Sequence, residues 1–185
     1  MKTITMYLVM VAILAMSACQ QPKESKEIAE QKNKEKFENK ADEKDAQFVV
    51  ETTNTLHTLI ALADVALEKN SPRAVATAKN VKPEFQNLLD EVEAYASAHV
   101  ISIPSEATER STDHVRKLLD EKPSTFDTKW CNEIRDTNRD LIREMESYGS
   151  NTNDLNIKTW LNSALPHVRN VQDKLVDFEN RLSKN

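Results

Sequence analysis

Apolar residues recur at intervals of three and four along most of the chain from Asp45 onward, a spacing that places side chains on one helix face. Four long stretches share this pattern. Their apolar stripes are Phe48, Thr52, Leu56, Leu59, Ala63 and Leu67; Val75, Ala78, Val81, Phe85, Leu88, Val92 and Tyr95; Phe126, Trp130, Ile134, Thr137, Leu141, Met145 and Tyr148; and Ile157, Leu161, Ala164, Val168, Val171, Leu175, Phe178 and Leu182. The pattern predicts four long helices that share one core.

Residues that begin or end helices separate the four stretches. The first helix is predicted over residues 45–69. Ser71, followed by proline, is typical of a helix N-cap, and Ser124 is predicted to cap the third helix. Gly149, the single glycine of the chain, is predicted to end that helix, and the fourth helix to begin near Asn153.

A long connection over residues 100–108 separates the second stretch from the third, and a short amphipathic segment with Val115 precedes the third. Pro83 and Pro166 interrupt the second and fourth stripes and predict kinks there. Two helical hairpins joined in this way predict an all-α fold. We expect a ferritin-like antiparallel four-helix bundle with a short extra helix in the central crossover.

The N-terminal residues show a different pattern. Lys2 precedes an apolar run over residues 6–18. A helix that spans a bilayer needs about 20 apolar residues, so this run is too short and predicts a signal peptide over residues 1–18.

The run ends in the letters MSAC at residues 16–19, which resemble the lipobox of bacterial lipoproteins. In this interpretation Cys19 becomes the lipid-bearing N-terminus, with Met16 in the place of the more usual leucine. Two glutamines follow Cys19, and neither position holds the aspartate that would resemble an inner-membrane retention signal. This favours the outer membrane. Cleavage of a plain secretory peptide after Ala18 is the alternative. Whether the domain faces the periplasm or the exterior stays open.

Charged residues dominate the segment that follows the lipobox. Between Lys23 and Lys44 there are seven lysines and seven acidic residues, and only Ile28 and Phe37 are large and apolar. Such a segment lacks the apolar surface needed to fold by itself. We therefore interpret residues 19–44 as a lipid anchor with a solvated, charged tether, and residues 45–185 as the bundle domain.

Charge and motifs exclude several function classes. The chain has 25 Lys and Arg against 30 Asp and Glu, a formal net charge of −5, so no overall positive field attracts nucleic acid. A single glycine excludes glycine-rich phosphate loops. The GxSxG, HExxH and CxxC motifs do not occur. We expect a protein that is not an enzyme, needs no cofactor and binds no nucleic acid.

From Asp45 to the Leu-Pro pair at residues 165–166 the chain resembles a bacterial envelope family, the domain of unknown function numbered forty-one forty-two. The resemblance rests on Asp45 with Phe48, on the letters ISIP at residues 101–104, on the Phe-Asp pair at residues 126–127 and on that Leu-Pro pair. It implies a secreted or lipidated protein with a ferritin-like domain.

Family members commonly carry ionisable residues inside the bundle: an Asp-His pair in the second helix, histidines in the third and fourth, and acids in the first. The resemblance places these positions here on Glu84, Phe85, Asn138, Val171, Leu59 and Ala61. Glu84 alone keeps an ionisable oxygen ligand. The resemblance therefore implies that this chain has replaced the family's inward-facing groups mainly with core residues, and we assign no metal site.

The remaining candidates are the histidines and one further cysteine. None of His57, His99, His114 and His167 has an acidic residue three or four positions away, so the Glu-x-x-His ligand pattern of di-iron bundles does not occur. We expect His57 to be structural and half-buried. Cys131 is expected to be buried beside Trp130; an intermolecular disulfide or a redox-sensing thiol is the alternative.

Together these patterns predict an outer-membrane lipoprotein, anchored through Cys19, whose non-enzymatic helical bundle serves envelope interaction or stress-related binding. Its expected partners are the membrane and a protein of the envelope. The alternatives are a metal-binding ferritin-like protein with a degenerate site and a ligand-binding bundle opened at Pro83 and Pro166.

Overall fold

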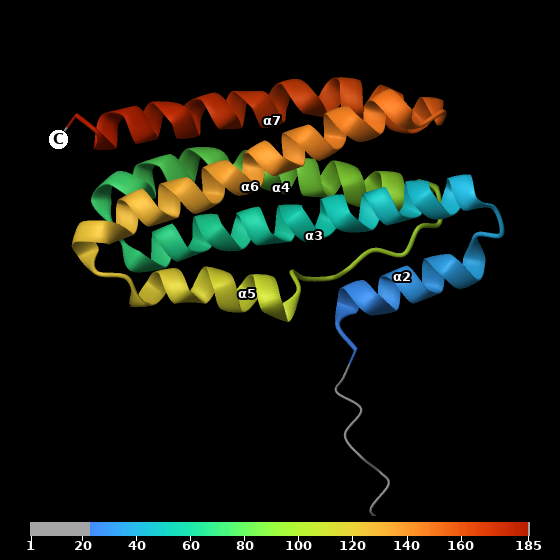
Figure 1. Ribbon diagram of the computed structural model, residues 1–185, viewed down its shortest axis with the longest axis horizontal. Coiled ribbons are helices and arrows are strands. Elements are labelled where there is room, and N and C mark those ends of the chain that lie inside the picture. Colours follow the sequence, from blue (N-terminus) through green and yellow to red (C-terminus); the bar gives the residue numbers. More distant parts are fainter. Residues whose placement is uncertain (1–22, 185) are drawn as a thin grey trace, which may run out of the picture.

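The structure is a computed structural model that describes residues 23–184, and every regular element among them is helical (Figure 1). The elements are α2 (Ser25–Lys36), α3 (Lys40–Lys69), α4 (Pro72–Ala98), α5 (Glu109–Arg116), the 3-10 helix η1 (Lys117–Asp120), α6 (Pro123–Asn151) and α7 (Leu155–Leu182). The predicted all-α class is confirmed. The residues of the predicted signal peptide and Cys19 lie outside the described residues.

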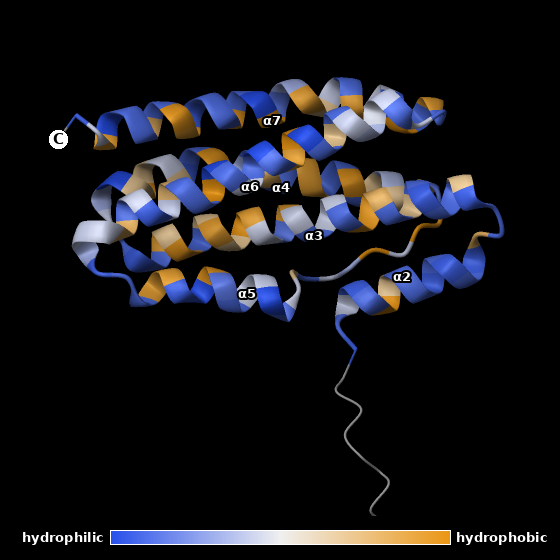
Figure 2. Cartoon of the chain, viewed as in Figure 1, coloured by the Kyte–Doolittle hydropathy of each residue, from blue (hydrophilic) through white to orange (hydrophobic). Residues whose placement is uncertain are grey.

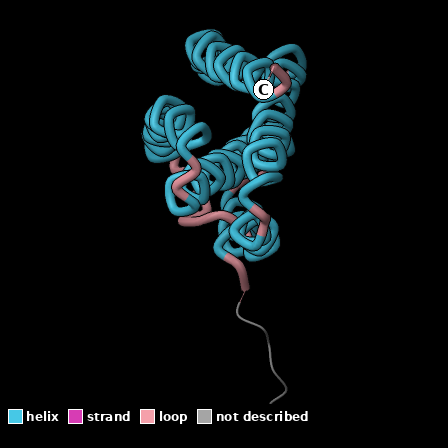
Figure 3. Tube along the Cα trace, turned by 90° about the vertical axis from the view of Figure 1, so that its left-hand side faces the viewer, coloured by secondary structure: helices cyan, strands magenta, loops and turns pink. Residues whose placement is uncertain are grey.

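Two antiparallel hairpins of long helices form the body of the molecule. Helix α3 pairs with α4 and α6 pairs with α7, while α3 also packs on α6 and α4 on α7 (Figure 1). Figure 3 looks along these helices and shows them packed side by side. The connection from α4 runs back along the bundle and through α5, so α4 and α6 point in the same direction.

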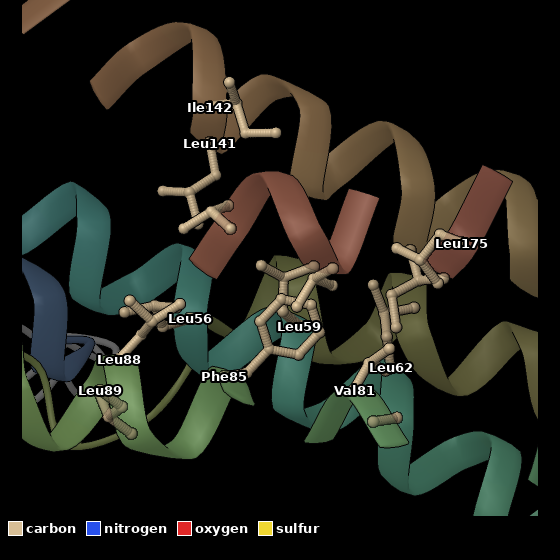
Figure 4. Packing of buried hydrophobic residues seen from close by; sticks show 14 of the residues in the cluster. Leu56, Leu59, Leu62, Val81, Phe85, Leu88, Leu89, Leu141, Ile142 and Leu175 are labelled. Carbon is tan, nitrogen blue, oxygen red and sulfur yellow. The ribbon is translucent and has the colours of Figure 1, made fainter. Parts of the chain in front are cut away.

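The predicted stripes form the core. Apolar and polar residues alternate along each long helix (Figure 2), and most of the buried apolar residues form one cluster. Leu59, Phe85 and Val171 are each 0% exposed and belong to one cluster, as their positions on the stripes predicted. Figure 4 shows Leu59 and Phe85 among the buried side chains that fill the space between the helices.

Some predicted helix ends differ from the observed ones. Helix α3 begins at Lys40, five residues before the prediction, because the Asn39 side chain accepts hydrogen bonds from two backbone N–H groups of its first turn. Ser71 stands at the N-cap of α4, but its hydroxyl donates to Asp127 instead of capping. The N-cap of α6 is Lys122, so Ser124 lies inside the helix and makes no cap.

Gly149 does not end α6, which continues to Asn151. A Cβ atom at Gly149 would lie 3.1 Å from the Leu161 side chain of α7, so the glycine permits close packing of the second hairpin. Helix α7 begins at Leu155, where the Asp154 side chain accepts from the backbone N–H of Ile157 at 2.8 Å.

The expectation of a solvated tether is wrong for residues 25–36. This segment forms α2, which packs against α3 and the crossover with Ala29 and Asn33 buried (Figure 1). The Asn33 side chain donates to the Ser102 carbonyl and accepts from the Ser102 N–H, both at 2.7 Å. Polar contacts attach this helix, and an argument based on apolar residues alone does not detect them.

Candidate functional site

A polar groove lies between α3, α5 and α6, and the residue before α2, Glu24, also lines it. Its volume is about 820 Å³. We call it the α5 groove, and its lining residues are Glu24, Asn54, Thr55, Thr58, Glu109, Arg110, Ser111, Asp113, His114, Lys117, Glu133 and Thr137.

Polar contacts at the N-terminus of α5 fix one wall of the groove. Thr108 caps the helix by accepting from the Ser111 N–H at 3.3 Å, and its own N–H donates to Asn54 of α3 at 3.0 Å. The next N–H, of Glu109, donates to the Glu24 carboxylate at 2.9 Å. A carboxylate at a helix N-terminus is favourable because the unpaired N–H groups there carry partial positive charge.

An ion pair crosses the groove toward α6. His114 Nε2 lies 2.7 Å from Glu133 Oε1, and the two side chains are 59% and 35% exposed. The pair carries opposite charges only when His114 is protonated. The contact links α5 directly to α6 across the groove.

The chemistry of the α5 groove is that of hydrogen bonding and charge. Its floor carries hydroxyls of α3 and α6, and its rim carries the exposed cations Arg110 and Lys117 beside the acids Glu109 and Asp113. Among residues 23–184, no group of three or more His, Cys, Asp or Glu side chains is placed to hold a metal ion. The groove can contact a polar partner through both signs of charge.

The four histidines lie on different elements. His57 of α3 is half-buried with Nε2 at 3.3 Å from the Pro104 carbonyl, so its predicted structural place is confirmed. His99 stacks on Tyr95 at the end of α4 and contacts the Tyr95 carbonyl through Nδ1 at 2.8 Å. His167 is exposed on α7. The fold brings His114 alone into the groove.

Cys131 is buried at 1% exposure, as predicted, with its Sγ atom 3.7 Å from the Leu175 carbonyl. Burial raises the pKa of this thiol to about 11, and the nearby Glu179 carboxylate adds to the shift. The neighbouring Trp130 is also buried and donates its indole N–H to the Leu62 carbonyl at 2.7 Å. The thiol is therefore protonated near neutral pH and shielded from reagents.

Of the positions that the family resemblance assigns to ionisable groups, Leu59, Phe85 and Val171 are apolar and buried, and Ala61 is apolar and partly buried. Asn138 is 0% exposed and donates to the Val168 carbonyl at 3.2 Å and to Gln172 at 2.8 Å. Its Oδ1 atom has no hydrogen-bond partner. Glu84 lies toward the surface and pairs with Lys174 at 2.9 Å.

Sequence reasoning missed the α5 groove because its lining comes from α3, α5, α6 and the residue before α2, which are distant in sequence. One local signal was present: Thr108 followed by an acidic residue is typical of a helix N-terminus. Sequence reasoning also missed a contact at the far end of the bundle. There the Asp45 carboxylate accepts hydrogen bonds from Tyr148 at 2.5 Å and from Thr152 at 3.1 Å.

Comparison with known proteins gives one match. Residues 30–177 match the family model described as "Domain of unknown function (DUF4142)". No curated protein and no solved structure matches the chain. Within the described residues, no helix is long and apolar enough to cross a membrane.

Proposed function

Because the chain belongs to the DUF4142 family, whose function the family description leaves open, we propose a function from the residues themselves. The proposal is an outer-membrane lipoprotein, anchored through Cys19, whose bundle acts by binding rather than by catalysis. The observation that carries it is the apolar run that ends in MSAC at residues 16–19. Each buried CH₂ of an acyl chain contributes about 0.8 kcal/mol, so several chains on Cys19 would retain the domain at a bilayer.

The connectivity supports a ferritin-like assignment for this bundle. Helices α4 and α6 point in the same direction, which a single long crossover between two hairpins produces. Leu59, Phe85 and Val171 fill the centre, where the resemblance implies ionisable groups in other members. This replacement supports a structural core and a non-enzymatic role.

The α5 groove is the surface that we propose for a protein partner in the envelope. It offers hydroxyls, the His114–Glu133 pair and two exposed cations over a volume of about 820 Å³. Charges of both signs at a rim favour recognition of a complementary polar surface and set the orientation of the partner.

Metabolic labelling with palmitate tests the anchor. We expect label in the wild-type chain and none in Cys19→Ser, which should also leave the membrane fraction. Cys131→Ser is the matched control, because Cys131 is the other cysteine of the chain and lies buried in the bundle. Label that persists in Cys19→Ser would contradict the proposal.

Photo-crosslinking in intact cells tests the groove. A crosslinkable amino acid at Lys117, on the rim, should give a discrete adduct of defined mass. The same residue at Lys79, which is exposed on α4 outside the groove, is the matched control. Equal crosslinking from both positions, or none from Lys117, would count against a partner in the groove.

A second candidate, metal binding at a degenerate ferritin-like site, is favoured by one observation. The Asn138 Oδ1 atom is buried without a partner, and amide oxygens are ligands for hard cations. Metal analysis of the dialysed full chain and of Asn138→Leu separates the candidates. A stoichiometric ion that the substitution removes supports metal binding, and an equal, trace content in both chains supports a purely structural core.

A further inference from the structure

We propose that α2 is a releasable strap, which holds the bundle close to the bilayer when docked and lengthens the link to the anchor when released. The inference rests on the proposed anchor at Cys19. It concerns residues 24–36 and the crossover beneath them, which are parts of the described structure.

The docked strap is attached almost entirely by polar contacts. Asn33 bonds both main-chain groups of Ser102, and the Lys36 ammonium donates to the Val100 carbonyl. At its other end the strap ion-pairs with α3, with 2.7 Å between Lys26 Nζ and Glu51 Oε1. These contacts specify one docked position, because Asn33 matches the donor and acceptor of a single residue.

Little apolar area keeps the strap in place. Ala29 is the one buried apolar side chain of α2, and Ile28 is 41% exposed. A helix of 12 residues is marginal in water by itself, so α2 depends on its contacts with the crossover. The crossover is a surface segment, so water can take the place of Asn33 on the Ser102 groups after release.

Docking changes the length of the link. From Cys19 to Glu24 there are six residues, which span at most ~20 Å when extended. Release of α2 frees the chain up to Asn39, the cap of α3, and the 21 residues from Cys19 then span at most ~70 Å. The strap thus sets how far from the membrane the α5 groove can act.

Two contacts at the N-terminal end of the strap couple it to the α5 groove. Glu24, directly before α2, accepts from the first N–H of α5, and the Ser25 hydroxyl lies 3.5 Å from the Glu106 carbonyl. Release of α2 therefore takes Glu24 away from the α5 groove. A partner that displaces Glu24 would bind more tightly to the released form, and its binding would favour release.

Hydrogen exchange on the full mature chain tests the release without reference to lipid. We expect the amides of α2 and of residues 100–108 to exchange together, at least about tenfold faster than those of α3 and α7. Raising NaCl from about 0.05 M to about 1 M should speed exchange in α2 and residues 100–108 but not in α3 or α7, because salt weakens the partly exposed Lys26–Glu51 pair.

Two variants sharpen that measurement. Asn33→Ala should speed exchange of α2 by about tenfold while the core helices keep their rates. Lys32→Ala is the matched control, since Lys32 is an exposed residue of the same helix outside the docking contacts. Exchange in α2 as slow as in α7, or equal effects of the two variants, would overturn the strap.

Energy transfer on vesicles tests the change of length. The lipidated chain carries a donor at Arg116→Cys, an exposed position on α5, and the bilayer carries acceptor lipid. We expect Asn33→Ala to lower the transfer and Lys32→Ala to leave it unchanged. A chain that carries no lipid would refute the proposed anchor, and the exchange result would still decide the strap. A lipidated Asn33→Ala chain with unchanged transfer would overturn the change of length.

Discussion

Helices α2 and α7 have the same backbone conformation and are stabilised in opposite ways. In α7 every buried residue is apolar: Ile157, Leu161, Ala164, Val168, Val171, Leu175 and Phe178. In α2 the buried residues are Ala29 and Asn33, and hydrogen bonds and ion pairs make the other contacts. Apolar burial is not weakened by charge screening, whereas ion pairs with exposed groups weaken as ionic strength rises.

This difference separates the parts of the molecule that can move from those that cannot. Burial of a large apolar side chain contributes about 1.5–3 kcal/mol, so the seven buried residues of α7 fix it to the bundle. The net contribution of a hydrogen bond to stability is about 0.5–1.5 kcal/mol. The free energy from the contacts of α2 is therefore nearly balanced by the conformational entropy that the chain gains on release.

The largest expected effect is in the core. Phe85→Ala should lower the free energy of unfolding by about 3–5 kcal/mol, because it removes a 0% exposed ring and leaves a cavity among four helices. Urea unfolding followed by circular dichroism measures this change. Phe85→Leu, which keeps most of the volume, should cost about 1 kcal/mol. A loss below about 1 kcal/mol for the alanine variant would contradict the assigned core.

Removal of α2 should have a smaller effect. A chain that starts at Asp45 loses α2, the Asn39 cap and the first turn of α3, which together contribute about 2 kcal/mol. Its melting temperature should fall by about 4–8 °C, and a chain that starts at Lys23, which keeps Glu24 and α2, is the control. If both chains melt together, the contacts of α2 do not stabilise the bundle.

These two regions also explain what the sequence could and could not predict. Spacing of three and four placed Leu59, Phe85 and Val171 in one core, because burial of apolar residues dominates helix packing. The docking of α2 was missed because it depends on Asn33 meeting the backbone of Ser102, which lies 69 residues away along the chain. A polar side chain on a charged helix carries no periodic signal of such a partner.

Helix ends and the groove were missed for related reasons. Glycine commonly ends a helix, but Gly149 lies inside α6, where a Cβ atom would stand 3.1 Å from the Leu161 side chain of the next helix. The α5 groove places His114 beside Glu133 of another helix. The spacing of residues along one segment does not predict such a contact between two helices. Burial of Cys131 was predictable, since its neighbour Trp130 lies on an apolar stripe.

The third prediction uses the buried thiol as a probe of the core at alkaline pH. The pKa of Cys131 is raised to about 11 by burial, so between about pH 9 and pH 11 the unfolded chain loses this proton before the folded chain does. The unfolded state then binds fewer protons, and stability falls as pH rises, by ~1–2 kcal/mol from this group. Tyr95 and Tyr148, whose pKa values burial also raises, act in the same direction.

Cys131→Ala isolates the thiol, because both tyrosines stay in the variant. Its free energy of unfolding should decline less steeply between about pH 9 and pH 11 than that of the wild type. Urea titrations at several pH values measure the two slopes. Parallel slopes would show that the thiol is already accessible to solvent in the folded protein.

The smallest expected effect lies in the crossover under α2. Val100 has a φ of 57°, in the left-handed region that β-branched residues avoid, and its side chain is 65% exposed. It occupies the turn that ends α4, where the Ile101 N–H donates to the Ala96 carbonyl at 2.8 Å. Val100→Gly removes the strain with little loss of burial and should stabilise the protein by about 0.5–1 kcal/mol, a rise in melting temperature of about 1–4 °C.

Asn70→Gly is the matched control, since Asn70 has a φ of 54° at the end of α3 and asparagine tolerates that conformation. Its melting temperature should change by less than about 1 °C. The carbonyl of Val100 accepts a hydrogen bond from the Lys36 ammonium of α2. A glycine at this position keeps that carbonyl, so the strap should stay docked in Val100→Gly. A glycine variant that melts lower than the wild type would mean that the exposed valine contributes packing which outweighs its backbone strain.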